Sequence, residues 1–398
     1  MADYMSDIKD ANAVMLALGL DYADLREAVG KLCERFPGSY WRDLDARSGY
    51  PTEFVRALTE AGYLGALVPE EYGGSGMPLR AAAVILETIN SSGCTASPAH
   101  AQMYIMGTLL RHGSTTQKRR YLPDIASGKL RLQAFGVTEP TSGSDTTKLR
   151  TRAQRKGDKY IINGQKVWTS RVLYSDLMLL LARTTPLEAV QKRTDGLSVF
   201  IVDLRNANGL QIKPIKTLIN HNTAEVFFDN LEVPADNLVG EEGKGFYYIL
   251  DGMNAERILV ASECIGDGRW LLSKGVNYAK EREVFGRPIG QNQGVQFPLA
   301  RAYAELEAAD MIARRAAALF DGGKPCGPDA NIAKFLASEA TWMAAEATLQ
   351  THGGFGFAHE YDIERKWREA RLYQTAPIST NLVLAFVAHH VLGLPRSY

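Results

Sequence analysis

The sequence predicts a mainly helical α+β protein with three successive domains. Short runs of β-branched and aromatic residues are confined to the middle of the chain, and helical periodicity dominates on both sides of it. The length of 398 residues allows two or three domains, each with its own core. We therefore expect an N-terminal helical domain over residues 1–130, a middle antiparallel β domain over 131–240 and a C-terminal helical bundle over 241–398.

The N-terminal domain carries two clear helix signals. Pro51 precedes a stretch with apolar residues at Phe54 and Leu58, and residues 81–89 are rich in strong helix formers. Between these stretches, residues 72–78 contain glycines and a proline, which are typical of a loop.

Short apolar runs in the middle domain indicate β-strands, because turn residues separate them. They are residues 132–137, 159–162, 165–168, 177–182, 197–202 and 225–228. Asn163 and Gly164 join the second run to the third. An Asn-Gly pair between two strands is a strong hairpin signal. We therefore expect a tight antiparallel hairpin at this point.

Long amphipathic helices are expected after the glycine-rich residues 240–245. Apolar residues recur at three- and four-residue steps through residues 299–320, and an alanine-rich stretch follows over 331–350. Several long amphipathic helices in succession indicate a bundle.

Composition and charge exclude several classes of function. Lysine plus arginine and aspartate plus glutamate number 45 each, so no net charge attracts the chain to nucleic acid or to an anionic membrane. The cysteines lie far apart and the histidines lack zinc-site spacing, so we expect neither disulfides nor a metal. The N-terminus does not resemble a signal sequence, and no apolar run approaches the roughly 20 residues that span a bilayer. We expect a soluble, cytoplasmic protein.

Four long stretches are more informative than the common short motifs, since GxxxxGK[ST], GxSxG and HExxH do not occur. They read FGVTEPTSGSD at residues 135–145, YIINGQKVWTS at 160–170, EREVFGRPI at 281–289 and QTHGGFG at 350–356. The first stretch places hydroxyl groups, glycines and backbone amides directly after a strand, which suits a polar, planar ligand.

The order and spacing of these stretches resemble those of the acyl-CoA dehydrogenase flavoproteins, from about residue 50 to the end of the chain. The resemblance implies the fold of that family, with a middle β-barrel or sandwich domain and a C-terminal four-helix bundle. It also implies FAD as cofactor, an acyl-CoA thioester as substrate and electron transfer flavoprotein as electron acceptor. A homotetramer, or else a homodimer, is the implied assembly.

The resemblance further implies which residues bind FAD. Residues expected at the flavin ring are Phe135, Val137, Thr138, Gly143, Ser144, Trp168, Thr169 and Ser170, and Ser144 is also expected near CoA. Those expected to reach the FAD of a neighbouring subunit are Arg282, Phe285 and Gln293. Further FAD contacts are expected at Gln350, Gly353, Gly354, Ser379 and Asn381. Aromatic planes and hydroxyl donors suit an isoalloxazine ring, and a guanidinium suits a pyrophosphate.

The catalytic base is the main departure from the common pattern. Many relatives carry it as a Glu on a loop, but the matching position here is Pro377. Relatives that resemble isovaleryl-CoA and long-chain acyl-CoA dehydrogenases place the Glu on a helix immediately before an Arg, as in Glu256-Arg257. We therefore expect Glu256 to be the base and Arg257 to contact CoA. The alternative is an ordinary surface Glu-Arg pair.

Pro377 also affects how the substrate is polarised. The implied reaction removes a proton from the α-carbon and passes a hydride from the β-carbon to the flavin, which gives a trans-2-enoyl-CoA. In relatives, a backbone N–H of this loop helps to polarise the thioester oxygen, and proline has no N–H. Either Ala376 or Ile378 supplies the amide, or the carbonyl is polarised differently.

The acyl group is less defined by the sequence. A base on the helix leaves space near the α-carbon, which favours a branched or bulky acyl group. Ser97, His100 and Tyr104 are expected near the far end of the acyl pocket, although His100 also fits a role in helix packing. Two other functions remain open: a flavin oxidase or monooxygenase on the same fold, and a non-catalytic homologue.

Overall fold

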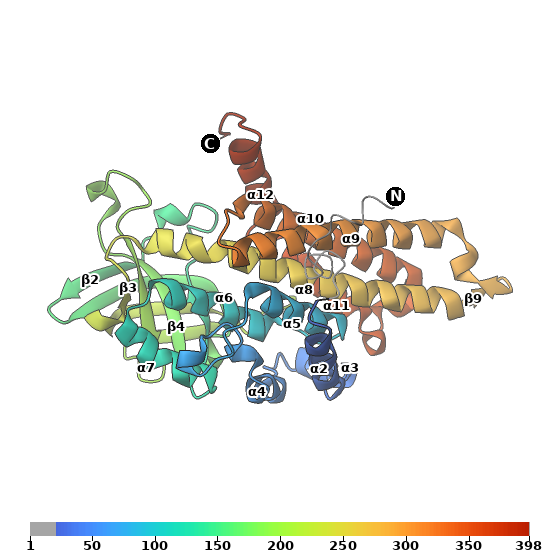
Figure 1. Cartoon of the computed structure of the whole chain (residues 1–398), viewed down its shortest axis with the longest axis horizontal. Helices are drawn as coiled ribbons and strands as arrows, with labels where there is room; N and C mark the ends of the chain where they lie inside the picture. The colour runs from blue at the N-terminus through green and yellow to red at the C-terminus, as the bar shows by residue number, and fades with distance from the viewer. Residues whose placement is uncertain (1–20, 398) are drawn as a thin grey trace, which may run out of the picture. The chain divides into compact units, whose positions relative to one another are not determined.

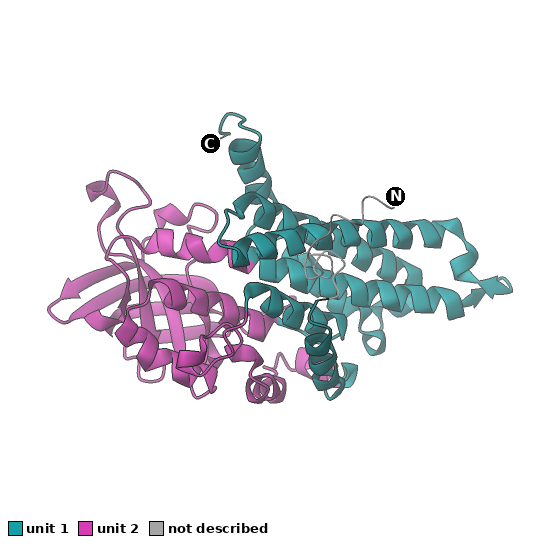
Figure 2. Cartoon of the chain, in the orientation of Figure 1, with its two compact units in different colours: residues 1–39, 78–96, 257–398 teal, residues 40–77, 97–256 magenta. Residues whose placement is uncertain are grey.

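The computed structural model describes residues 21–397 of the chain. The N-terminal residues from which we expect no signal sequence lie outside this range. The described residues form two compact units (Figure 2). Unit 1 comprises the described residues up to 39, residues 78–96 and residues from 257 onward, and unit 2 comprises residues 40–77 and 97–256. The division into three domains stays a prediction.

Unit 2 is built around an eight-stranded sheet. Its strands are β1 Leu132–Gly136, β2 Arg152–Lys156, β3 Lys159–Ser170, β4 Leu177–Arg183, β5 Leu197–Asp203, β6 Leu210–Pro214, β7 Thr223–Pro234 and β8 Leu238–Val239. They follow the order β6-β7-β3-β2-β4-β5-β8, and β1 pairs with β4. Most pairs are antiparallel, but β1 and β2 run parallel to β4. The sheet is therefore mixed, where the sequence pattern indicated an antiparallel one.

Strand β4 is buried along its whole length, which explains its uninterrupted apolar sequence. On one face, Leu179 and its alternate neighbours pack with apolar residues of the helices α6 (Ser97–His112) and α7 (Thr115–Ala126). On the other face, Leu180 packs with Phe200 and Val226. Helix α7 begins with a capping box in which Ser114 and Gln117 exchange side-chain and backbone hydrogen bonds. The helices α3 (Gly38–Ala46) and α4 (Thr52–Glu60) precede them in the chain.

The predicted hairpin at Asn163-Gly164 is wrong. Strand β3 runs continuously through these residues, and the turn of the hairpin lies between β2 and β3, where Lys156 pairs with Lys159. The pairing of β3 with β7 is irregular between Ile162 and Gly164. Gly164 has φ 151°, and a Cβ there would lie 2.7 Å from Cα of Thr151. The glycine thus permits a close strand approach and not a turn.

Unit 1 is helical. Its helices are α2 Ala23–Glu34, α5 Leu79–Ser91, the part of α8 (Gly245–Glu281) from residue 257, α9 Gln293–Asp321, α10 Gly327–His352, α11 Ile363–Tyr373 and α12 Thr380–Phe386. A hairpin of β9 (Glu283–Val284) and β10 (Arg287–Pro288) joins α8 to α9. Helices α8, α9 and α10 lie side by side (Figure 1). None of the helices in residues 21–397 is both long and apolar enough to cross a membrane.

Small residues let the helices of unit 1 approach closely. A Cβ at Gly266 of α8 would lie 2.3 Å from the backbone oxygen of Glu87 on α5, and one at Gly268 would lie 2.7 Å from Leu306 on α9. Thr341 of α10 donates a 2.6 Å hydrogen bond to the carbonyl of Cys264 on α8. The predicted helical periodicity of residues 299–320 and 331–350 is confirmed by α9 and α10.

Candidate functional site

A buried ion pair fixes the loop that follows β1 in unit 2. Lys166 of β3 is fully buried, and its ammonium donates to the carbonyl of Val137 and to the carboxylate of Glu139, both at 2.9 Å. The Glu139 carboxylate also accepts the backbone N–H groups of Arg150 at 2.7 Å and Thr151 at 2.9 Å. One carboxylate therefore joins both ends of the loop to the neighbouring strand.

Burial and the mutual interaction of the two groups shift the pKa values of both Lys166 and Glu139. Burial lowers the pKa of Lys166 to about 8, although the charge of Glu139 opposes this shift. Burial raises the pKa of Glu139, but Lys166 and the two backbone donors outweigh burial and leave that pKa below its ordinary value. Both groups are charged at neutral pH, and the lysine is close to releasing its proton.

The same loop is joined directly to the expected flavin strand. The N–H of Val167 donates to the carbonyl of Thr138 at 2.9 Å, in the stretch where the pairing of β3 with β7 becomes irregular. At this irregularity Trp168 adopts a left-handed backbone with φ 61°. Its indole is 59% exposed, although it belongs to a central strand. The hydroxyl of Thr169 is buried and has no hydrogen-bond partner among the described residues.

The structure therefore brings several residues of the predicted ring site together. Val137 and Thr138 lie beside Trp168 through the contacts above. The hydroxyl of Ser170 accepts a 2.7 Å hydrogen bond from the side chain of Asn220. Gly143 and Ser144 are exposed on the loop.

Helix α6 connects this loop with the helix that carries Glu256. Midway along α6, the ring of Tyr104 packs on Phe135 with centroids 5.9 Å apart. At the C-terminal end of α6, His112 forms a 3.0 Å contact with Asp251 of α8. A Cβ at Gly252 of α8 would lie 3.2 Å from the guanidinium of Arg111. The two helices thus pack directly on one another.

Glu256 lies one helical turn beyond Gly252, on the same face of α8. Its side chain is buried, with a residue exposure of only 6%. Glu256 therefore lies on the face of α8 that turns toward α6. Because its side chain is buried, it is not part of an ordinary exposed Glu-Arg pair.

A polar cluster surrounds the start of α6. The guanidinium of Arg171 donates to the hydroxyl of Ser97 and to the side-chain oxygen of Asn220, both at 3.4 Å. The rings of His100 and Tyr104 are 4.9 Å apart. Burial and the charge of Arg171 lower the pKa of His100 to about 3, so the imidazole is neutral at physiological pH. That these residues contact the acyl group stays a prediction.

In unit 1, the loop that contains Pro377 is held by a buried lysine. Lys334 of α10 is fully buried and donates a 2.7 Å hydrogen bond to the carbonyl of Ile378. Burial lowers the pKa of Lys334 to about 8, and the charge of Arg257 contributes to the lowering. Ser379 lies at the N-cap of α12, where its hydroxyl accepts the N–H of Leu382 at 3.4 Å.

Some of the residues predicted near the dinucleotide lie around the turns that end α8 and α10. The Arg282 guanidinium is 5.9 Å from the ring of Phe355, which belongs to the turn after α10. In that turn a Cβ at Gly353 or Gly354 would meet no atom within 4 Å. Phe285 is fully exposed at the tip of the β9–β10 hairpin. Three further predicted contacts are exposed on α9, α10 and α12, namely Gln293, Gln350 and Asn381.

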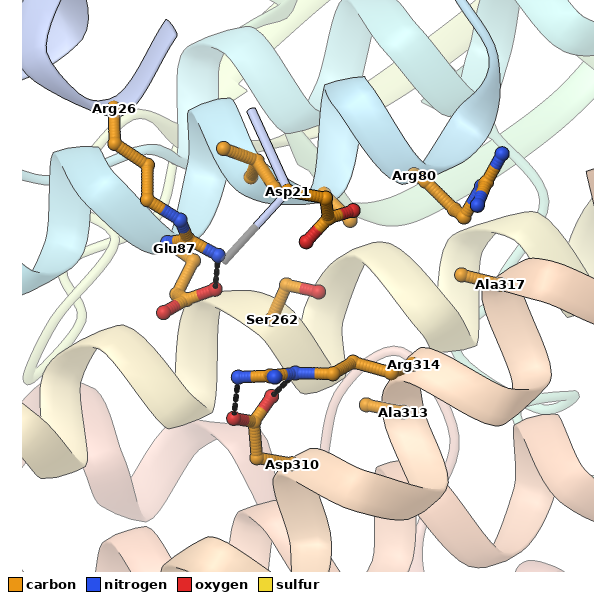
Figure 3. Close-up of a pocket in the computed structure, with 11 residues that line it drawn as sticks. Asp21, Arg26, Arg80, Glu87, Ser262, Asp310, Ala313, Arg314 and Ala317 are labelled. Atoms are coloured by element: carbon orange, nitrogen blue, oxygen red, sulfur yellow. Dashed lines mark hydrogen bonds and ion pairs between the residues drawn. The ribbon is translucent and has the colours of Figure 1, made fainter. Parts of the chain in front are cut away.

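A small crevice in unit 1 is lined by charged side chains that pair with one another (Figure 3). It has a volume of about 30 Å³. Arg26 pairs with Glu87 at 3.1 Å, and Arg314 pairs with Asp310. Carboxylates of the chain itself neutralise both arginines, so the charges that line the crevice do not require a bound ligand. Within residues 21–397, no group of His, Cys, Asp or Glu side chains is arranged to hold a metal ion.

Sequence reasoning missed Glu139, Lys166 and Lys334. For Lys166 a signal existed, because it continues the alternation of Tyr160 and Ile162, whose side chains are buried on β3. For Lys334 no comparable signal existed, because its role depends on the loop around Ile378, which is distant in sequence.

Comparison with known proteins identifies the family. Three family models match in order: the acyl-CoA dehydrogenase N-terminal domain over residues 21–129, the middle domain over 134–231 and the C-terminal domain over 243–392. The chain is 36% identical over 379 residues to an acyl-CoA dehydrogenase of Mycobacterium bovis, which covers 94% of this chain and 96% of the relative. The chain belongs to the acyl-CoA dehydrogenase family.

Solved structures agree with this assignment. A glutaryl-CoA dehydrogenase in complex with glutaryl-CoA has a TM-score of 0.87 and 31% identity, with 94% of this chain and 95% of that chain covered. A chain from a structure described as the electron transferring flavoprotein of Acidaminococcus fermentans has a TM-score of 0.87 and 30% identity, with coverages of 92% and 97%. The protein thus has the acyl-CoA dehydrogenase fold, with N-terminal helical, middle β and C-terminal helical parts.

Acyl-CoA dehydrogenases are oxidoreductases and flavoproteins, so FAD is the expected cofactor. The residues present fit such a group. Unit 2 exposes the indole plane of Trp168 beside a loop that the buried ion pair holds in place. Unit 1 leaves open space at Gly353 and Gly354, where a bulky ligand can approach the backbone.

Proposed function

We propose that this protein catalyses the α,β-dehydrogenation of an acyl-CoA thioester to a trans-2-enoyl-CoA, with Glu256 as the base that takes the α-proton. The observation that carries the proposal is the burial of Glu256 on the α6-facing side of α8. Burial keeps bulk water away from the carboxylate, as abstraction of a proton from carbon in a closed site requires. Pro377, at the position where many relatives carry the base, cannot accept a proton.

The other residues have supporting roles in this proposal. The ring site comprises Phe135, Val137, Thr138, Gly143, Ser144, Trp168, Thr169 and Ser170. FAD, when bound there, supplies the acceptor for the hydride from the β-carbon. Arg257 contacts the CoA part of the substrate. Lys334 holds the loop of Pro377 through Ile378, so that a neighbouring amide can remain in place to polarise the thioester oxygen.

Membership of the family supports a proposal for the electron acceptor and for the assembly. We propose electron transfer flavoprotein as the electron acceptor and a homotetramer, or else a homodimer, in the cytoplasm. The fully exposed Phe285 supports an assembly, because a large apolar side chain at a hairpin tip gains free energy when a second subunit covers it. In such an assembly Arg282, Phe285 and Gln293 reach the FAD of the neighbouring subunit.

For the acyl group, we propose a branched or bulky chain. A base on α8 leaves the loop of Pro377 free of a carboxylate, and this supports extra volume near the α-carbon. An anaerobic series of acyl-CoA thioesters that vary in length and branching, followed by bleaching of the flavin, tests both the reaction and the acyl preference.

The decisive variant is Glu256→Gln. It should bind FAD normally, yet flavin reduction by acyl-CoA should slow by about a hundredfold or more, because general-base catalysis contributes roughly 10²–10⁴-fold. Glu281→Gln, an exposed position on the same helix, is the matched control and should reduce at the normal rate. Normal reduction in the Glu256→Gln variant would exclude Glu256 as the base.

The second candidate function is a flavin oxidase or monooxygenase on the same fold. The chain's similarity to a solved prolyl acyl carrier protein oxidase, with a TM-score of 0.82 and 26% identity, supports it. If the flavin that acyl-CoA has reduced persists in air while the enoyl product is bound, the dehydrogenase is supported; rapid reoxidation with hydrogen peroxide release would support the oxidase.

A further inference from the structure

The loop between α11 and α12 in unit 1 is held at both ends by α10. We call residues 374–379 the α11–α12 loop. At its start, the side-chain amide of Gln374 donates a 3.0 Å hydrogen bond to Glu339 of α10. At its end, Lys334 of α10 donates to the carbonyl of Ile378 at 2.7 Å. One helix therefore fixes the backbone of the loop at two points, and this limits the directions in which its N–H groups can point.

Most N–H groups of the α11–α12 loop are not available to a ligand. Those of Thr375 and Ala376 donate to the last turn of α11, both at 2.9 Å. Pro377 has no N–H. The N–H groups of Ile378 and Ser379 donate to no acceptor among residues 21–397. Ala376, one of the two residues expected to polarise the thioester oxygen, is therefore excluded as the donor.

The two remaining N–H groups differ in how they are held. The peptide bond between Ile378 and Ser379 is trans. A trans peptide is planar, so its C=O and N–H groups point in opposite directions. Because Lys334 binds the Ile378 carbonyl, the Ser379 N–H is fixed on the side away from the ammonium. The Ile378 N–H belongs to the peptide of Pro377, whose carbonyl accepts no hydrogen bond within the described part of the chain.

Lys334 also makes the Ser379 N–H a stronger donor. A cation that binds the oxygen of a peptide group polarises the N–H of the same group. Lys334 is fully buried, and it forms no ion pair with any residue that the structure describes. Water therefore screens its charge only weakly where that charge acts on the peptide.

The first turn of α12 does not account for this donor. The N–H of Thr380 donates to the carbonyl of Gln374 at 3.2 Å, and that of Leu382 donates to the Ser379 hydroxyl at 3.4 Å. Both of these N–H groups are thus occupied. The Ser379 N–H precedes the helix, and its direction is set by the buried ammonium of Lys334.

We propose that the N–H of Ser379 polarises the thioester oxygen of the substrate, and that Lys334 is the positioning residue that orients and strengthens this donor. The inference rests on the proposed function. When the α-C–H bond breaks, the proton goes to Glu256 and the electron pair of the bond shifts toward the thioester oxygen. A donor that is already in place at this oxygen stabilises the developing charge. The chain thus replaces the N–H that Pro377 lacks with one that lies slightly further along the same loop.

Ser379→Pro tests the donor directly, because it removes the N–H at a residue whose φ of −68° already suits proline. It also removes the hydroxyl that caps α12, so Ser379→Ala, which loses only the hydroxyl, is the matched reference. Flavin reduction by acyl-CoA should be about a hundredfold slower or more in Ser379→Pro than in Ser379→Ala, since one oxyanion donor contributes roughly 10²–10³-fold. Equal rates would overturn the proposal. So would a loss of bound FAD confined to Ser379→Pro, because the N–H would then hold the cofactor.

The carbonyl of a bound thioester reports the hydrogen bond without turnover. The probe is 3-methylbut-2-enoyl-CoA labelled with ¹³C at the thioester carbonyl, and infrared difference spectra are recorded on the FAD-loaded protein. A hydrogen bond lowers the stretching frequency of the carbonyl. The frequency should fall on binding to the unaltered protein and to Ser379→Ala, and it should fall less in Ser379→Pro and Lys334→Met. No shift in the unaltered protein, or the same shift in all four proteins, would overturn the inference.

Two variants of Lys334 separate its charge from its hydrogen bond. Lys334→Gln keeps a donor for the Ile378 carbonyl but removes the charge, whereas Lys334→Met removes both. Flavin reduction should therefore slow by about tenfold or more in Lys334→Met and by less in Lys334→Gln, since charge-assisted hydrogen bonds are about twice as strong as neutral ones. A rate in Lys334→Met equal to that of the unaltered protein would exclude the positioning role.

The pH profile gives a signature that a merely structural lysine would not produce. Burial lowers the pKa of Lys334 to about 8, while Cys264 and Glu339 oppose this shift and Arg257 adds to it. The charge is lost as the pH rises through this value, so kcat/KM should decline above about pH 8. Lys334→Gln should not show this decline. A decline that persists in Lys334→Gln would belong to another group and would overturn the role of the charge.

Failure of the proposed function is recognised separately. If no acyl-CoA reduces the flavin of the unaltered protein, the proposed dehydrogenation fails, and the infrared spectra still decide whether the Ser379 N–H binds a thioester carbonyl. If acyl-CoA reduces the flavin but Ser379→Pro and Ser379→Ala react at equal rates, the dehydrogenation stands and only the assignment of the donor fails.

Discussion

The ion pair of Glu139 and Lys166 allows a quantitative test of how the loop after β1 is stabilised. In a Glu139→Gln variant the lysine loses its anionic partner in a site where it is fully buried. With a folded pKa of about 8, protonation of Lys166 at about pH 7 is favourable by only about 1.4 kcal/mol, one pKa unit. The lysine can become neutral in the variant. Its contribution to the loss of free energy of unfolding therefore cannot exceed about 1.4 kcal/mol.

Loss of the Glu139 carboxylate also removes a hydrogen-bond acceptor, which lowers the free energy of unfolding further. Glu139 accepts the N–H groups of Arg150 and Thr151, and a glutamine offers one acceptor oxygen where the carboxylate offers two. Leaving one buried N–H without an acceptor costs about 1–3 kcal/mol. The free energy of unfolding should therefore fall by about 2–4 kcal/mol at about pH 7.

The pH dependence has a defined sign. The folded pKa of Lys166 lies below the unfolded value of 10.5, so the unfolded chain binds more protons between about pH 8 and about 10.5, and this group makes stability rise with pH there. Above about pH 8 the lysine is neutral in the unaltered protein as well. The cost of Glu139→Gln should therefore shrink by about 1 kcal/mol between about pH 7 and about pH 9.

Urea unfolding of the FAD-loaded protein at the two pH values measures these differences, and flavin fluorescence reports release of FAD. The matched control is Glu232→Gln, which breaks the exposed 2.7 Å pair with Lys159 between β3 and β7; it should cost less than about 1 kcal/mol. The Glu139→Gln/Lys166→Met variant should be no less stable than Glu139→Gln alone at about pH 7. A cost of Glu139→Gln that matches the control, or that does not change with pH, would refute the reasoning.

Three further outcomes are expected. Gly164→Ala should reduce the free energy of unfolding by more than about 1 kcal/mol, because its Cβ would lie 2.7 Å from Cα of Thr151; chemical denaturation measures the loss, and Gly157→Ala, which has open space, shows the cost of a positive φ alone. Lys334→Met should lower the rate of flavin reduction by acyl-CoA and leave FAD content unchanged, because it frees the loop at Ile378; unchanged reduction would argue against a positioning role. The ring resonances of His100 in NMR spectra should show no titration between about pH 5 and about pH 8, since its pKa is about 3.

The element types were largely predictable from the sequence, and the failures have physical causes. Strand β2 (Arg152–Lys156) is mostly basic and exposed, so it lacks the apolar alternation that indicates a strand. The predicted hairpin failed because Gly164 serves close packing against Thr151, a contact that only the folded sheet reveals.

The candidate site could be predicted only where single residues carry its chemistry. Glu256 and Trp168 are predicted as site residues because their neighbours in sequence resemble those of known relatives. The structure adds that Glu256 is buried and that Trp168 is exposed. By contrast, the groups that hold the loop after β1 in place contact one another across long sequence separations, as Lys166 does with Glu139. A local sequence pattern does not indicate such a contact.

The long helix α8 has a consequence for engineering the enzyme. Residues 245–256 of this helix belong to unit 2 and residues 257–281 to unit 1, so the boundary between the units falls between Glu256 and Arg257, inside an unbroken helix. A chimera spliced at this boundary would join two half-helices, and a single inserted residue would rotate everything after it by about 100°. The proposed base, Glu256, would then no longer keep its orientation relative to the arginine that follows it. Recombination that exchanges acyl preference between relatives should therefore transfer α8 whole, together with its packing partner α6.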